Sequence, residues 1–170
     1  QSLAAPAETL NGVDSQSGGA LWAGSQVIIS GCHVYGSHAR EGGGLYLNWG
    51  GDVVNSEIYS NTADMRGGGV FLRQGTDARL ENNQIHRNAS GYDYFGGEGG
   101  GVYLANNVRP ILRGNQLVQN VSGAGSAAYL YHNTFATLES NAATENNGGW
   151  AVYMHTEQDA LLTGNEYRLG

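Results

Sequence analysis

The chain repeats one phrase, Gly42-Gly43-Gly44-Leu45-Tyr46-Leu47, along most of its length. Close copies lie at 67–72 and 99–104. Looser copies lie at 18–23, 126–131 and 149–154. Six copies of one phrase within 170 residues indicate a repeat architecture. The fold is therefore predicted from what one repeat can form and from how successive repeats stack.

A second shared segment follows each phrase, and its clearest copy is Leu80-Glu81-Asn82-Asn83-Gln84-Ile85. Both segments are short and alternate apolar with polar or aromatic residues, which is the period of a β-strand. No stretch keeps an apolar period of about 3.6 residues over the roughly ten residues that a helix needs. The sequence therefore predicts an all-β protein.

The spacing of the copies predicts a parallel β-solenoid. The first apolar residues of the phrases are residues 21, 45, 70, 102, 129 and 152, which lie 24, 25, 32, 27 and 23 residues apart. Six circuits of the chain, here called rungs, would stack at about 4.8 Å per rung. Left-handed solenoids use shorter, hexapeptide-based repeats, so we expect a right-handed parallel β-helix over residues 18–170. Residues 1–17 are expected to form an arm or a partial rung that covers one end.

Two columns of amide side chains support this stacking. Asn tolerates the left-handed backbone of turns, and stacked amides can hydrogen-bond one another from rung to rung. Ser56 and Cys32 continue the first column, with Cys32 expected as a small buried residue, and Ser37 and Gly170 continue the second. The columns are Asn83, Asn115, Asn141 and Asn165, and Asn61, Asn88, Asn120 and Asn146.

The glycine phrase, paired with the segment Asn82-Asn83-Gln84-Ile85-His86-Arg87-Asn88, resembles right-handed β-helix repeat proteins. These include the pectate-lyase-like superfamily, secreted surface β-helix proteins and the polymorphic outer-membrane passengers. The resemblance covers residues 18–170 and implies the fold. It leaves the activity open, because this scaffold hosts lyases, hydrolases, adhesins and structural proteins.

Composition excludes several classes of protein. A net charge of −7 argues against nucleic-acid binding, because phosphates are held by clustered cations. A single cysteine excludes an intrachain disulfide and a cysteine-based metal cluster. No apolar run approaches the roughly 18 residues of a membrane span. The chain begins at Gln1, as a secreted protein does after signal-peptide removal, which favours an extracellular or cell-surface location, although a trimmed chain would begin in the same way.

An outer aromatic column is the first candidate functional feature. If Leu45 and Leu47 point inward, Tyr46 points outward, since successive side chains of a strand alternate between its faces. The column could stabilise the solenoid by stacking between rungs, bind another subunit, or bind a glycan. Its expected members are Trp22, Tyr46, Phe71, Tyr103, Leu130 and Tyr153.

The longest repeat supplies a second candidate, an insertion at residues 89–98. Insertions in solenoids become loops on one face, often the binding face. The insertion could be a solvated or assembly loop, or it could grip a glycan and supply two carboxylates for acid–base catalysis. Its candidate residues are Tyr92, Asp93, Tyr94, Phe95 and Glu98.

The resemblance also implies what an enzyme of this type would carry. Pectate-lyase-like enzymes hold calcium with an aspartate cluster beside a catalytic arginine, and galacturonan hydrolases carry Asp-Asp and Gly-His-Gly motifs together with a lysine. The present chain has no Asp-Asp pair, no Gly-His-Gly and no lysine, and its histidines occupy different repeat positions. The sequence therefore predicts no cofactor and no bound metal, and it favours a non-catalytic protein.

These observations predict an exported structural or adhesive protein that associates with copies of itself. Open solenoid ends template the addition of another chain, and head-to-tail contacts build open filaments. The rival explanation of such ends is that the chain is one piece of a longer solenoid. The aromatic column is an alternative contact surface for the same association. The remaining interpretations are a polysaccharide lyase or glycoside hydrolase with its site at residues 89–98, and a glycan-binding module without turnover.

Overall fold

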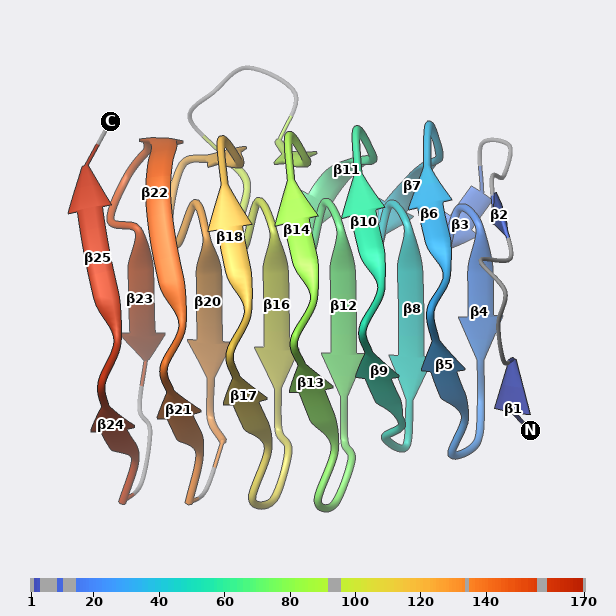
Figure 1. Cartoon of the computed structure of the whole chain (residues 1–170). Helices are drawn as coiled ribbons and strands as arrows, with labels where there is room; N and C mark the ends of the chain where they lie inside the picture. Colours follow the sequence, from blue (N-terminus) through green and yellow to red (C-terminus); the bar gives the residue numbers. More distant parts are fainter. Residues whose placement is uncertain are drawn as a thin grey trace.

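The chain forms a stack of parallel rungs in which equivalent strands of successive rungs pair with one another (Figure 1). The computed structural model describes residues 2–3, 9–10, 15–91, 96–133, 135–155 and 159–169. Every strand pairing among them is parallel, and none of these residues lies in a helix. Within this part of the chain there is accordingly no helix that could cross a membrane. The predicted all-β solenoid of about six rungs is confirmed.

The strands form four walls, which we call sheets A to D. Sheet A contains β1 (Ser2–Leu3), β5 (Ile28–Ser30), β9 (Asp52–Val54), β13 (Arg79–Glu81), β17 (Ile111–Arg113), β21 (Thr137–Glu139) and β24 (Leu161–Thr163). Sheet B contains β2 (Thr9–Leu10), β6 (His33–Tyr35), β10 (Glu57–Tyr59), β14 (Gln84–His86), β18 (Gln116–Val118), β22 (Ala142–Gly148) and β25 (Glu166–Leu169).

Sheet C joins sheet B through the long strand β22, and sheet D stands alone. Sheet C contains β3 (Ser15–Ser17), β7 (His38–Glu41), β11 (Thr62–Arg66), β15 (Ala89–Ser90), β19 (Val121–Ser122) and the end of β22. Sheet D contains β4 (Leu21–Ala23), β8 (Leu45–Asn48), β12 (Val70–Arg73), β16 (Val102–Ala105), β20 (Ala128–Tyr131) and β23 (Val152–His155).

The glycine triplets form the corner between sheets C and D. The first glycine of each triplet has a positive φ, for example +64° at Gly42 and +62° at Gly67, a conformation that costs glycine little. The second glycine of each triplet has no room for a side chain. A Cβ atom on Gly43, for example, would lie 2.4 Å from the carbonyl oxygen of Gly68 in the next rung. The repeated phrase therefore marks a tight corner followed by a strand of sheet D.

The core lies inside the rungs and continues along the whole stack. Each strand contributes an inward aliphatic side chain that lies over its equivalent in the next rung, as Val53, Leu80 and Leu112 do in sheet A. All three are 1% exposed or less. The same alternation places the second side chain of each sheet D strand on the outer face of the stack.

Both predicted amide ladders are present at corners of the stack. In the ladder between sheets A and B, Asn83 donates from its backbone N and from Nδ2 to Oδ1 of Asn115, at 3.1 and 3.0 Å. Nδ2 of Asn83 also donates to the carbonyl of Val53 in the preceding rung, at 2.7 Å. The ladder between sheets B and C repeats this pattern from Asn61 to Asn146.

The left-handed residue of each of these turns is the one before the ladder position. Asn82 and Arg87 have φ values of +55°, and each precedes a ladder asparagine. A third ladder, which the sequence analysis missed, follows sheet D, where Nδ2 of Asn107 donates to Oδ1 of Asn133 at 2.9 Å. The positive φ therefore belongs to the preceding residue, and the ladder amide holds the corner closed.

Residues 1–17 contribute three short strands to the stack. β1, β2 and β3 pair in parallel with β5, β6 and β7. The described residues of this segment therefore occupy the sheet A, B and C positions of a rung that precedes β4. Gly170, expected at the end of the second ladder, lies outside the described residues.

Candidate functional site: a groove on the outer face of sheet D

An aromatic column runs along the outer face of sheet D, as the repeated phrase predicts. The pairing of β16 with β20 sets Tyr103 opposite Tyr129, and Leu104 opposite Leu130. The expectation that Leu130 belongs to this column is therefore wrong, because Leu130 lies in the core. In this rung the phrase starts at Gly125, whose φ is positive like that of Gly99 in the preceding rung. The strand that follows begins with the small residue Ala128, which pairs with Val102.

The corrected column contains an aromatic residue in all six rungs: Trp22, Tyr46, Phe71, Tyr103, Tyr129 and Tyr153. Ring centroids from Tyr46 to Tyr153 are 4.8, 4.9, 5.2 and 4.8 Å apart. Edge-to-face and offset arrangements at such distances stabilise aromatic pairs.

The middle of this column is buried although it lies outside the core. Tyr46, Phe71, Tyr103 and Tyr129 are only 3–6% exposed and form a hydrophobic cluster of their own. Trp22, at the end of the column, is 54% exposed. The column therefore acts as a second core within the chain, and its central rings offer little surface to a partner.

A charged row borders the aromatic column at the corner from sheet C. Arg66 donates from Nε to Oε2 of Glu98 at 2.7 Å and from Nη1 to Oε1 of Glu41 at 3.2 Å, so one guanidinium links three rungs. Its Cζ also lies 5.6 Å from the ring centre of Tyr103. Burial is the largest single effect and lowers the pKa of Arg66, but the hydrogen bond to Glu98 and the electrostatic effects of Tyr103, Glu98 and Glu41 together outweigh it, so the pKa is raised.

A mixed column borders the aromatic column on its other side. It consists of the last residue of each sheet D strand from β8 to β23: Asn48, Arg73, Ala105, Tyr131 and His155. The ring of Tyr131 lies 5.2 Å from that of His155 and 4.1 Å from that of His132 in the following turn. This column therefore combines hydrogen-bonding side chains with a partly exposed aromatic ring.

Together the three columns form a groove of about 380 Å³. Arg66 and Glu98 line one side, and Phe71, Tyr103 and Tyr129 line the floor. The other side is lined by Asn106 and by four residues of the mixed column: Arg73, Ala105, Tyr131 and His155. The structure thus brings together Glu98, Phe71 and Tyr103, which the sequence analysis placed in two separate candidate sites, and adds Tyr129.

The phenols on the floor are held in their neutral form. Burial, with a smaller effect from the charge of Glu98, raises the pKa of Tyr129 to about 12. The same two causes raise the pKa of Tyr103 further above its ordinary value. Both hydroxyls are therefore hydrogen-bond donors at neutral pH, and neither is a base or nucleophile there.

Of the insertion at residues 89–98, the structure places the two ends. Tyr92, Asp93, Tyr94 and Phe95 lie outside the described residues. Glu98 pairs with the backbone of Arg66 and Ala124 in the neighbouring rungs. Its carboxylate binds Arg66 and so completes a structural triad. In the described part of the chain, no group of three or more His, Cys, Asp and Glu residues could hold a metal ion.

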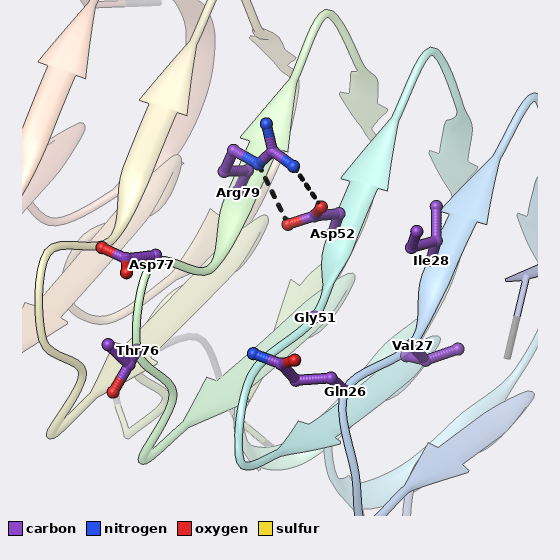
Figure 2. Close-up of a pocket in the computed structure, with 8 residues that line it drawn as sticks. All are labelled: Gln26, Val27, Ile28, Gly51, Asp52, Thr76, Asp77 and Arg79. Atoms are coloured by element: carbon purple, nitrogen blue, oxygen red, sulfur yellow. Dashed lines mark hydrogen bonds and ion pairs between the residues drawn. The ribbon is translucent and has the colours of Figure 1, made fainter.

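A second hollow, of about 500 Å³, lies where sheet D turns into sheet A (Figure 2). The turn between β8 and β9 has three residues, 49–51, and the next turn, between β12 and β13, has five, 74–78. The longer turn projects past the shorter one and leaves a ledge. Arg79 and Asp52, which both line this hollow, are paired with each other, because Arg79 donates to both carboxylate oxygens of Asp52 at 3.2 and 2.6 Å.

Sequence reasoning missed much of the groove. Arg66, Arg73, Asn106, Tyr131 and His155 share no residue type from rung to rung, so no repeated pattern marks them. The available signal was their place in the phrase. The pairing of the strands puts Tyr131 and His155 in the fourth position of β20 and β23, beside the aromatic column.

The comparisons with known proteins identify the family and no individual relative. No curated protein and no solved structure matches the chain significantly. A family model described as "Right handed beta helix region" matches residues 9–167, which is nearly the whole chain. The parallel stack of rungs agrees with this match, and the chain belongs to the right-handed β-helix family.

Proposed function

We propose that this chain is an adhesive β-helix that binds carbohydrate in the groove on the outer face of sheet D. An adhesive role requires display outside the cell, and we propose an extracellular or cell-surface location with it. The observation that carries the proposal is the groove itself, a hollow with an aromatic floor and hydrogen-bonding walls on a rigid sheet. Pockets with an apolar surface and a few convergent polar groups are the usual form of binding sites.

The groove matches a carbohydrate in its chemistry. A sugar presents hydroxyl groups around its ring and apolar C–H groups on its faces. Asn106, Tyr131 and His155 supply donors and acceptors along one wall, and the Tyr131 ring supplies a partly exposed apolar surface. The stacked rungs hold these side chains in a row, so an extended chain of sugars could contact several rungs.

Binding to oligosaccharides would test this function. We expect calorimetric titration with a panel of neutral and acidic oligosaccharides to detect a ligand. We expect Tyr131→Ala to weaken its binding about tenfold, the equivalent of one lost hydrogen bond. Thr76→Ala, in the hollow of Figure 2, is the matched control and should leave binding unchanged.

Two results would contradict the proposal. One is the absence of binding across the panel, and the other is equal weakening by Thr76→Ala and Tyr131→Ala. Cleavage of a bound oligosaccharide would instead indicate a lyase or hydrolase. Asp93→Asn and Glu98→Gln would then show whether the insertion at residues 89–98 carries the reaction, and turnover unaffected by both would exclude it.

We propose self-association as a second function, through the rung formed by β23, β24 and β25. Leu162 is 46% exposed there, whereas Leu138, its partner in the preceding rung, is 2% exposed. Leu161 and Tyr167 are also exposed, at 57% and 41%. A rung supplied by a second copy would cover these side chains and extend sheets A, B and D.

Sedimentation over a range of concentrations would test this association. Leu162→Glu should abolish it, because a charge would be buried without a partner. Ile28→Glu is the matched control, since Ile28 is also 46% exposed but lies on the outer face of sheet A. A wild-type chain that stays monomeric at high concentration would contradict self-association and leave carbohydrate binding unaffected.

A further inference from the structure

The charges in the groove are balanced at one wall and unbalanced at the other. On the wall next to sheet C, Arg66 is matched by the two carboxylates of Glu41 and Glu98. On the opposite wall, the side chain of Arg73 has no hydrogen bond or ion pair with any described residue, although it lines the groove and is exposed.

An unmatched arginine is unusual in this chain. Arg40, on the outer side of β7, is the other arginine without a partner among the residues that the structure describes. The remaining six of the eight arginines donate to side chains: Arg66, Arg79, Arg87, Arg109, Arg113 and Arg168. A cation left unmatched inside a groove is therefore a specific feature of Arg73.

The residues around Arg73 in the groove offer further hydrogen-bonding groups. In the mixed column, Ala105 stands between Arg73 and Tyr131 in adjacent rungs. Ala105 is buried against the aromatic column, at 4% exposed, so the side chains of Arg73 and Tyr131 stand on either side of it. Asn106 follows Ala105 directly and lines the same groove.

We propose that Arg73 binds an anionic substituent, a carboxylate or a sulfate ester, of the carbohydrate in the groove. The inference rests on the proposed carbohydrate binding and specifies its ligand. A guanidinium donates two parallel N–H groups to a carboxylate or sulfate and so fixes its orientation. Asn106 and Tyr131 line the same groove and offer further donors.

The other charges of the groove do not oppose this assignment. Glu41 and Glu98 lie on the far side of the aromatic column and are held by Arg66. His155 belongs to the same column as Arg73 and would add positive charge when protonated. The net charge of −7 predicts weak long-range attraction for an anionic polymer, so recognition would depend on the contact with Arg73.

The test compares oligosaccharides of one backbone that carry carboxylates, sulfates or neither group. We expect the wild-type chain to bind one or both anionic forms at least about tenfold more tightly than the neutral form, with the preference reduced by salt. Arg73→Gln should remove this preference and leave binding of the neutral form unchanged. Arg73→Lys should restore part of it, because lysine keeps the charge but loses the forked geometry.

Arg40→Gln is the matched control and should leave the preference intact. Equal binding of neutral and anionic forms, or equal losses in Arg40→Gln and Arg73→Gln, would overturn the role of Arg73 while carbohydrate binding stands. Failure of all three forms to bind would overturn the proposed function itself. The anionic form that binds identifies the substituent as carboxylate or sulfate.

Discussion

The corner between sheets C and D and the outer face of sheet A use the same arginine fork in opposite surroundings. At that corner, Arg66 links Glu41 and Glu98 beside the sheet D rings, which are almost fully buried. On sheet A, Arg113 links Glu81 and Glu139 in the same way, but no aromatic column covers them. The difference shows that one solenoid can carry a second core on one outer face and a solvated polar surface on another.

The two faces should therefore contribute differently to stability. Burial of a large aromatic side chain removes much apolar area from water, whereas exposed ion pairs gain little because water and salt screen them. We expect stability to depend on the outer face of sheet D about as strongly as on the core. The outer face of sheet A should serve mainly to keep the strands soluble and in register.

The largest effect is expected for Phe71→Ala, at the centre of the aromatic column. Phe71 is 3% exposed and contacts the rings of Tyr46 and Tyr103, so truncation should lower the free energy of unfolding by about 3–5 kcal/mol. Leu72→Ala, in the inner core, is the reference and should cost a similar amount. Urea denaturation measures both.

Ile111→Ala, on the outer face of sheet A, completes this comparison. Ile111 is half-buried in β17, and its loss should cost only about 1 kcal/mol. A Phe71→Ala variant no less stable than Ile111→Ala would show that the aromatic column is not a second core.

The repeated phrase was sufficient to predict the rungs. Its glycines occupy a corner where a side chain would meet the next rung, and Asn83 and Asn115 recur where an amide closes a turn. Such positions are physically restricted, so the same residue types return in each repeat. The prediction was wrong at Leu130 because Ala128 is too small to mark the start of its strand.

The groove could not be predicted in the same way. Its walls contain Arg73, Ala105 and Tyr131 at equivalent positions, and these residues share neither size nor charge. Nothing in the fold requires one residue type on an outer surface beside the aromatic column. Residues that differ from rung to rung leave no periodic signal, and they come together only when the rungs are stacked.

Alkaline titration should separate the two faces further. In the folded chain the pKa of Tyr129 is raised to about 12, mainly by burial, whereas an unfolded tyrosine titrates near pH 10. The neutral phenol is thus favoured in the folded state, so its contribution to stability is complete below about pH 10 and is lost as the pH rises to about 12.

Tyr129→Phe removes this titration while keeping the ring. We expect wild-type stability to fall more steeply between about pH 10 and pH 12 than that of Tyr129→Phe. Denaturation curves at several alkaline pH values measure both slopes, and tyrosinate absorbance reports the ionisation directly. Identical slopes would mean that Tyr129 is no more protected from water than an exposed tyrosine.

The smallest effect is expected for Arg113→Lys on sheet A, and it bears on why all eight basic residues of the chain are arginines. Arg113 donates from Nη1 to Glu81 at 3.1 Å and from Nε to Glu139 at 2.8 Å, so its two acceptors lie in the rungs on either side. The planar guanidinium reaches both at once, whereas a lysine ammonium is a single point of charge that would favour one neighbour. The variant should unfold at nearly the wild-type urea concentration, with a small loss of stability at low salt that disappears at high salt.

The same substitution at Arg66, which lies against Tyr103 and is partly buried, should lower stability more and depend less on salt. Equal losses and equal salt dependence at the two positions would show that the aromatic column does not shield its neighbouring charges from water.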